Sequence, residues 1–196
     1  MPSPIGHTIA GFCGFLLAPK GLIAKSQFNN TLLASIVLAN LPDIDILPGL
    51  VLGNPAIFHR QGTHSITASI LVGIFVSMLG RWNRASVKFI QLGVWATALY
   101  FSHIFLDLLV TDPSPPRGVQ LLWPFSNAYF ISPITIFNGF NYFDPEIGML
   151  RSVLRLNNLM TALREIVLLM PIYGCIHYLL YLSTNEKVVK VMKRRR

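Results

Sequence analysis

Long stretches without a charged side chain are the feature that most limits what this chain can fold into. From Ser65 to Gly80 no residue is charged, and two later stretches, 89–106 and 166–182, contain no Asp, Glu, Lys or Arg. A helix that crosses the hydrocarbon core of a bilayer needs about 20 predominantly apolar residues. With 53% apolar and only 12% charged residues, against about 25% charged in soluble domains, the sequence predicts a membrane protein.

Start and stop signals divide the chain into about five helices, expected at residues 5–18, 31–41, 65–80, 87–110 and 158–182. We expect Pro42 to end the second, because the residue before a proline resists the helical conformation. Residues 127–156 contain too many Pro, Gly and Asn for a straight span. The predicted fold class is all-α: a polytopic membrane bundle forming one domain over residues 1–196.

The basic residues are unevenly distributed between the two ends of these helices. If the helices cross in turn, eleven of the sixteen Lys and Arg lie on one side: Lys20, Lys25, Arg81, Arg84, Lys88 and the six after Glu186. Such clusters beside apolar spans mark the cytoplasmic side, so we expect a multi-pass inner-membrane protein with its C-terminus in the cytoplasm. They do not form the basic face that a nucleic-acid partner requires.

Histidine and aspartate residues are expected together on the opposite, non-cytoplasmic side. Seven of them come from separate segments: His7, Asp43, Asp45, His59, His64, His103 and Asp107. His103 and Asp107 are four residues apart and share one face of a helix. Ionisable side chains at membrane depth usually mark a functional site, so we favour metal ligation over a structural His–Asp hydrogen bond.

The segments around these residues suggest individual roles. Asp43 and Asp45 alternate in what we expect to be an extended loop, where each could bind one metal or one could orient a histidine. We expect Thr63 to cap the following helix and to hold His64 in its first turn. His177, midway along the last helix, is expected to be a hydrogen-bonded packing residue outside the site.

Two arginines on the same side are candidates for substrate binding. Arg60 and Arg117 can clamp a phosphate in a bidentate manner, although contact with lipid headgroups is an almost equal alternative. Arg60 and Asp45 are also our candidates for catalytic residues.

Nitrogen and oxygen ligands without thiolates fit zinc first, with manganese and iron as alternatives, and seven ligands suit two ions better than one. The main hypothesis, which rests in part on the family resemblance given in the next paragraph, is a divalent-metal hydrolase that cleaves a phosphoester of a lipid or lipid-linked substrate with metal-activated water. Two other classes remain as alternatives. One is a metal-ion binding or transport protein, and the other is a non-catalytic membrane interaction protein with a structural metal. Membrane lipids are the expected partners, and no protein partner is assigned.

The motifs also resemble a known family. His7 in a helix start, Leu41-Pro42-Asp43-Ile44-Asp45, His59-Arg60-x-Gly62-x-His64, His103-x3-Asp107 and Leu122-Trp123-Pro124-Phe125 follow one another over residues 3–126. In this order they are similar to the YdjM-like family of membrane-bound, metal-dependent hydrolases, also described as LexA-binding and inner-membrane-associated. The resemblance implies a divalent-metal hydrolase and carries ligand roles to the seven His and Asp residues. A weaker similarity to zinc-dependent phospholipase C favours phosphoester chemistry. The C-terminal helix and basic tail, about 158–196, match no motif.

Overall fold

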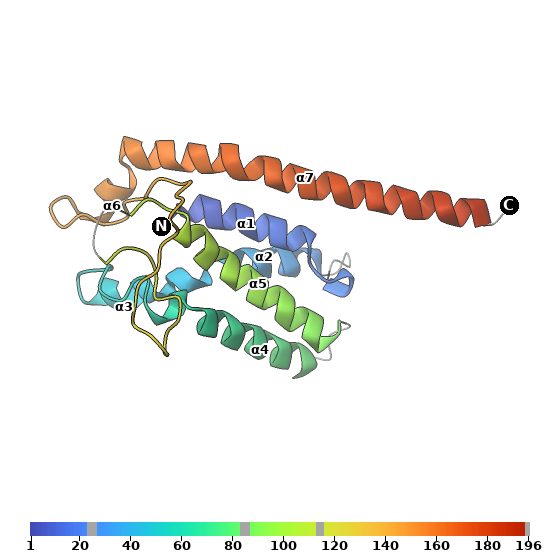
Figure 1. Ribbon diagram of the computed structural model, residues 1–196, viewed down its shortest axis with the longest axis horizontal. Helices are drawn as coiled ribbons and strands as arrows, with labels where there is room; N and C mark the ends of the chain where they lie inside the picture. The colour runs from blue at the N-terminus through green and yellow to red at the C-terminus, as the bar shows by residue number, and fades with distance from the viewer. Residues whose placement is uncertain (23–26, 83–86, 113–115, 195–196) are drawn as a thin grey trace.

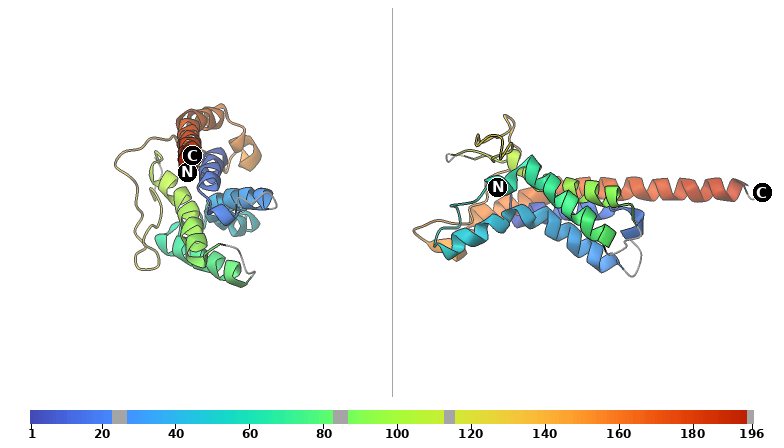
Figure 2. Two further views of the ribbon diagram at one scale, coloured as in Figure 1. Left: turned by 90° about the vertical axis from the view of Figure 1, so that its right-hand side faces the viewer. Right: turned by 90° about the horizontal axis from the view of Figure 1, so that it is seen from below.

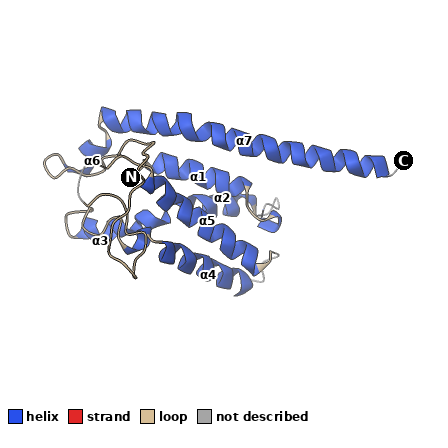
Figure 3. Ribbon diagram, viewed as in Figure 1, coloured by secondary structure: helices blue, strands red, loops and turns tan. Residues whose placement is uncertain are grey.

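The structure is a computed structural model that describes residues 1–22, 27–82, 87–112 and 116–194, with side chains as far as 185 (Figure 3). Its α-helices are α1 (Pro4–Leu16), α2 (Phe28–Asn40), α3 (Ile46–Val51), α4 (Ile66–Trp82), α5 (Phe89–Leu108), α6 (Gly148–Val153) and α7 (Leu156–Arg194). Short 3₁₀ turns cover Lys20–Leu22 (η1), Leu41–Asp45 (η2) and Gly62–His64 (η3). In these described ranges, β-type pairing is limited to two isolated bridges, Val110 with Phe137 and Val119 with Phe130. The predicted all-α fold with five long helices is confirmed.

Helices α1, α2, α4 and α5 form the bundle, and α7 lies along α1 (Figure 1). The end-on view in Figure 2 places α7 beside α1 at one edge and α4 beside α5 at the other. The core between α2 and α5 includes Leu38, Ala39, Trp95, Ala96 and Leu99.

The contact between α4 and α5 depends on a small residue. A Cβ atom on Gly73 would lie 1.9 Å from Thr97 Oγ1 and 2.7 Å from the carbonyl oxygen of Gly93. Small residues at helix interfaces allow this close backbone approach, as is common between membrane helices. The two helices therefore pack closely against each other.

Among the described residues, three helical segments are long and apolar enough to cross a membrane: Phe28–Val51, Phe89–Leu108 and Leu156–Asn185. Helices α1 and α4 are apolar but shorter. Only 6% of the apolar window in α7 is buried against the protein, which leaves its remaining apolar surface for lipid. At about 1.5 Å per residue, the 39 residues of α7 extend well past the bundle, as Figure 1 shows.

α2 ends at Asn40, one residue before the predicted end at Leu41. The prediction that Asp43 and Asp45 lie in an extended loop is wrong. Pro42 occupies the first turn of η2, where a missing backbone N–H costs nothing because that group has no intrahelical acceptor. The chain therefore tightens into a 3₁₀ turn and continues into α3, which was expected to be loop. Residues 127–156 form no straight span, as expected, although they include the short α6.

The expected cap at Thr63 is also wrong. Gly62–His64 form the turn η3, and Ser65 is the extended residue that follows it. Ser65 Oγ accepts a hydrogen bond from Ala68 N at 3.0 Å, so Ser65 caps α4. His64 consequently precedes the helix and is free to face the bundle axis.

The two ends of the bundle differ in chemistry. α1, α4 and α7 begin at one end, and α2 with η2 and α5 finish at that same end (Figure 1). Lys20 in η1, Arg81 in the last turn of α4 and Lys88 before α5 lie at the other end. Lys25 and Arg84 fall outside the described residues. Successive long helices of the bundle therefore run in opposite directions, as the prediction from the Lys and Arg distribution assumed.

Candidate metal centre

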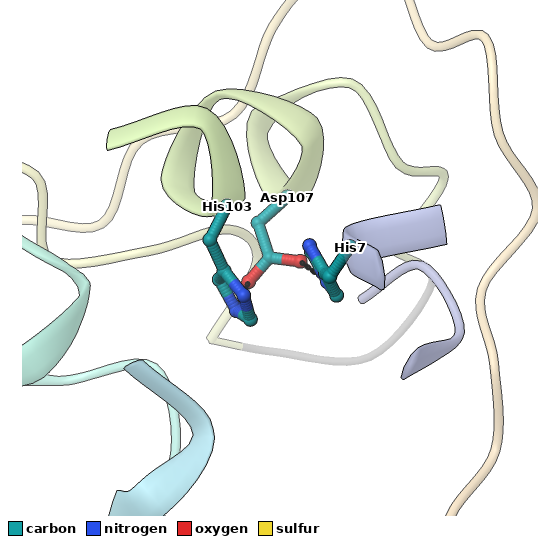
Figure 4. Close-up of side chains that lie close together, drawn as sticks. All are labelled: His7, His103 and Asp107. Carbon is teal, nitrogen blue, oxygen red and sulfur yellow. Dashed lines mark ion pairs between the residues drawn. The ribbon is translucent and has the colours of Figure 1, made fainter. Parts of the chain in front are cut away.

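All seven predicted metal ligands meet at one end of the bundle. His7 comes from α1, Asp43 and Asp45 from η2, His59 from the following loop, His64 from η3, and His103 and Asp107 from α5. Figure 4 shows His7 reaching from α1 toward His103 and Asp107 on successive turns of α5. The cluster is buried: His7, His64 and His103 are 0% exposed and Asp107 is 2% exposed. Ionisable groups are rarely buried in this number without a partner that compensates the cost.

Four ligand atoms form the centre of the cluster. His64 Nε2 lies 3.3 Å from Asp107 Oδ2 and 3.6 Å from Asp43 Oδ1. His103 Nε2 lies 3.3 Å from Asp43 Oδ1 and 3.7 Å from Asp107 Oδ2. A tetrahedral cation with bonds of about 2.0 to 2.2 Å separates its ligands by about 3.3 to 3.6 Å. The four distances given, 3.3 to 3.7 Å, are close to that separation. The ligand atoms of Asp43, His64 and His103 also all lie within 4.8 Å of one another.

His7 extends the cluster on the far side of Asp107. Its ring stacks on that of His103, with centroids 3.6 Å apart and planes 12° from parallel. His7 Nε2 lies 3.7 Å from Asp107 Oδ1, while the other oxygen of Asp107 faces His64 and His103. Asp107 thus presents one oxygen to each of two neighbouring ligand groups, an arrangement suited to bridging two cations.

The unpaired polar atoms of the protein are concentrated here. Eight buried side-chain nitrogen and oxygen atoms in the described residues have no hydrogen-bond partner. Seven belong to five proposed ligands: His7 Nδ1 and Nε2, Asp43 Oδ1, His64 Nε2, His103 Nε2, and Asp107 Oδ1 and Oδ2. The eighth is Arg60 Nε. Buried polar groups are nearly always hydrogen-bonded, so these residues form a site that fits a bound cation.

Hydrogen bonds on the outer side of two rings set which nitrogen faces the centre. His103 Nδ1 lies 2.9 Å from the carbonyl oxygen of Ala39, in the last turn of α2, where helix carbonyls lack intrahelical donors. A proton on Nδ1 satisfies that carbonyl and leaves the Nε2 lone pair for a metal. His64 Nδ1 similarly lies 3.0 Å from Thr63 Oγ1 and 3.2 Å from Asp45 Oδ2.

Asp45 and His59 lie at the edge of the cluster, where they form with His64 a further group that could hold a metal ion, and both also have hydrogen-bonding partners. Asp45 accepts hydrogen bonds from Thr63 Oγ1 at 2.7 Å and Arg60 N at 3.1 Å, and its other oxygen lies 3.0 Å from His59 Nδ1. His59 Nε2 lies 2.9 Å from the sulfur of Met1. Of the two roles considered for an Asp-x-Asp pair, this geometry favours Asp45 as the carboxylate that orients histidines.

The pKa values of His59, in the loop, and His64, in η3, are shifted in opposite directions. Burial lowers the pKa of His59 below its usual value, and the hydrogen bond with Asp45 offsets this only in part. Burial also opposes a charge on His64, but the adjacent carboxylates of Asp107, Asp43 and Asp45 outweigh it and raise the pKa of His64 well above its usual value. The carboxylates at the centre therefore favour a positive charge at this point, which a divalent cation would supply in place of the proton.

Comparison with known proteins agrees with the sequence motifs. The family model described as YdjM inner membrane protein matches residues 1–184. The chain belongs to the YdjM family. It is also 35% identical over 137 residues to the inner membrane protein YbcI of Escherichia coli (strain K12), which covers 68% of this chain and 73% of that protein. No solved structure matches significantly. The resemblance inferred from the motifs is confirmed, and with it an inner-membrane protein.

In this YdjM-family chain, a polar pocket of about 570 Å³ opens beside the cluster. His59, Arg60, Asp112 and Tyr142 are among its lining residues. Arg60 has a φ of 67°, an uncommon left-handed conformation for a residue other than glycine. Its side chain forms an ion pair with Asp112, which also accepts a hydrogen bond from Gly118 N at 3.2 Å. Arg60 is thereby held at the pocket wall, directly after one histidine of the cluster.

The structure separates the two arginines that were predicted to bind substrate. Arg117 is exposed and is not among the residues that line the pocket. His177 is exposed on α7, with its ring stacked 6.4 Å from that of Tyr173. It is the one histidine of the chain outside the cluster, as predicted.

Sequence reasoning missed three residues near the site. Asp112, Tyr142 and Glu165 were not among the predicted site residues. Tyr142 packs edge-on against His59 with centroids 5.1 Å apart, and burial raises the pKa of Tyr142 to about 12, so its hydroxyl keeps its proton. Glu165 is 0% exposed and lies against the start of α1. Only Glu165 carried a usable signal, because a carboxylate in an apolar helix is costly without a role.

Proposed function

We propose that this YdjM-family protein is a membrane-embedded, divalent-metal-dependent hydrolase that cleaves a phosphoester of a lipid or lipid-linked substrate. The observation that carries the proposal is the set of seven unpaired, buried ligand atoms on His7, Asp43, His64, His103 and Asp107. Imidazole and carboxylate groups without thiolates suit zinc, and also manganese or iron. Two ions fit the way in which Asp107 faces ligands on both sides.

The bound metal would polarise a phosphoryl oxygen and make water a nucleophile near neutral pH. The chain itself supplies the arrangement of groups around that chemistry. Asp45 orients His59 and His64 through hydrogen bonds, and the Ala39 carbonyl orients His103. Such outer hydrogen bonds commonly change metal affinity or activity by about 10- to 100-fold.

Arg60 is the residue we assign to the anionic group of the substrate. A guanidinium is always protonated and cannot bind a metal, but it can pair with phosphate through two parallel hydrogen bonds. Arg60 lines the pocket beside His59, and its Nε is buried without a partner. Asp112 holds the guanidinium at the pocket wall through the ion pair. The exposed Arg117 is more consistent with headgroup contact.

The position of the pocket supports the proposal of a lipid or lipid-linked substrate. Helices with extensive apolar surface surround the cluster, so the pocket opens at the end of a bundle embedded in lipid. The Lys and Arg distribution favours a non-cytoplasmic face for this end and a cytoplasmic C-terminus. Substrate would then reach the site from the outer interface of the membrane.

The test combines metal analysis of the purified protein with a screen of phosphomonoesters, phosphodiesters and phospholipids. We expect about two divalent ions per chain and hydrolysis that is lost in His103→Ala and Asp107→Ala but kept in His177→Ala. The third variant is the matched control, since His177 is exposed and outside the cluster. Bound metal without hydrolysis of any ester would favour a structural or transported metal, and equal metal content in all three variants would refute the ligand assignment.

A further inference from the structure

Glu165 on α7 is a buried carboxylate outside the proposed ligand set, and it bonds the start of α1. Its Oε1 accepts a hydrogen bond from Ser3 N at 2.7 Å. Its Oε2 accepts one from Gly6 N at 3.1 Å and another from the hydroxyl of Ser3. The first N–H groups of a helix have no intrahelical acceptor, and the positive end of the helix dipole favours a carboxylate there. Glu165 therefore caps α1 from a helix at the other end of the chain.

This cap lies directly beside a proposed metal ligand. His7 follows Gly6, in the same turn that Glu165 holds. His59, His64 and His103 each have a ring nitrogen within hydrogen-bonding distance of a side chain or carbonyl that orients the ring. Neither nitrogen of His7 has such a partner in the part of the chain described. The place of the His7 ring is therefore set by the backbone of α1 and by stacking on His103.

We propose that Glu165 is the positioning residue for His7, fixing the first turn of α1 so that the ring reaches the Asp107 side of the metal centre. The inference rests on the metal site of the proposed function. Glu165 packs closely against Gly6, since a Cβ atom at residue 6 would lie only 2.7 Å from Glu165 Oε2. Helix α7 is otherwise little buried, so this contact is a specific link between α7 and the site. Groups that orient a ligand typically change metal affinity by about 10- to 100-fold.

The experiment measures Zn²⁺ affinity of the full-length protein in detergent by competition with a chelating dye. Glu165→Gln keeps the size of the side chain but replaces one acceptor oxygen with a donor that cannot accept from Ser3 or Gly6. We expect affinity about 10- to 100-fold weaker in this variant. Glu146→Gln, the same change at an exposed site, should leave it unaltered. Gly6→Ala, which displaces Glu165 by a different change, should weaken it similarly.

Each variant is repeated in a His7→Ala background, which separates positioning of His7 from general damage to the fold. Without His7, Glu165→Gln should cause no further loss of affinity. An equal loss in both backgrounds, or wild-type affinity in Glu165→Gln and Gly6→Ala, overturns the inference while leaving the metal site intact. Wild-type protein that binds no Zn²⁺ removes the proposed function itself, and the inference with it.

Discussion

Removing the metal should destabilise the protein strongly, because the seven unpaired ligand atoms would lose their partner while remaining buried. Leaving a buried polar group unsatisfied costs about 1 to 3 kcal/mol. Even at about 1 kcal/mol for each atom the total is about 7 kcal/mol. That is comparable with the whole stability of a folded domain, about 5 to 15 kcal/mol. Water entering the site and a proton on His64 would recover part of this cost.

Linkage gives a second measure of the same effect. A metal that is present at about a thousand times its dissociation constant stabilises the folded state by about 4 kcal/mol. For a chain of about 150 to 250 residues, each 1 kcal/mol shifts the midpoint of thermal unfolding by about 2 to 4 °C. We therefore expect stripping with a chelator to lower the midpoint by about 8 to 16 °C.

The assay is thermal unfolding of the detergent-solubilised protein, followed by tryptophan fluorescence before and after chelation, with metal content measured on the same samples. His177→Ala should show the full shift. A variant combining His103→Ala with Asp107→Ala should unfold at one temperature in both states, because it has no metal to lose. The reasoning would be refuted if the wild-type protein lost its metal and still unfolded at an unchanged temperature.

Three further outcomes are expected. His59→Ala should retain more metal than His103→Ala, because His59 is hydrogen-bonded to Asp45 while His103 Nε2 is unpaired at the centre. Metal analysis of the two purified variants tests this prediction, and an equal loss of metal would contradict it. Arg60→Lys should keep its metal but lose turnover, and Arg60→Ala should lose more. Removal of one charge-stabilising donor typically lowers the rate by about 10²- to 10³-fold, or about 2.7 to 4 kcal/mol, which sets the upper limit expected for Arg60→Lys. Full activity in Arg60→Ala would mean that Arg60 only contacts lipid headgroups. Single cysteines at Ala56 and Asn185 in a cysteine-free background should be labelled from opposite sides of the membrane, with Ala56 accessible from outside; labelling of Ala56 only from the cytoplasm would reverse the orientation.

The long helices and the identity of the clustered residues could be predicted from the sequence because each rests on a local signal. Uncharged stretches mark helices in a membrane, and the four-residue spacing of His103 and Asp107 places both on one face whatever surrounds them. The convergence of seven residues also followed, since alternating helices return to the same end of a bundle.

The local conformation at η2 could not be predicted in the same way. A proline is compatible with the end of one helix and with the first turn of the next, and only the packing of η2 against α5 and η3 decides between them. That turn places Asp43 at the centre of the cluster and Asp45 where it accepts hydrogen bonds, so the different roles of the two carboxylates depend on it. Likewise, Asp112 and Tyr142 acquire their places only through the loop that folds over the pocket.

The contact between Glu165 and the start of α1 joins residues about 160 positions apart in the chain. Ser3 and Gly6 leave the ribosome about 160 residues before Glu165, which corresponds to roughly 10 to 30 s at about 5 to 20 residues per second. Throughout that interval the opening turn of α1 lacks the Glu165 carboxylate, and by its end all seven proposed ligands have been made. A chain cut short before Leu156 would therefore carry all seven histidine and aspartate side chains and still lack the residue that holds the first of them in place.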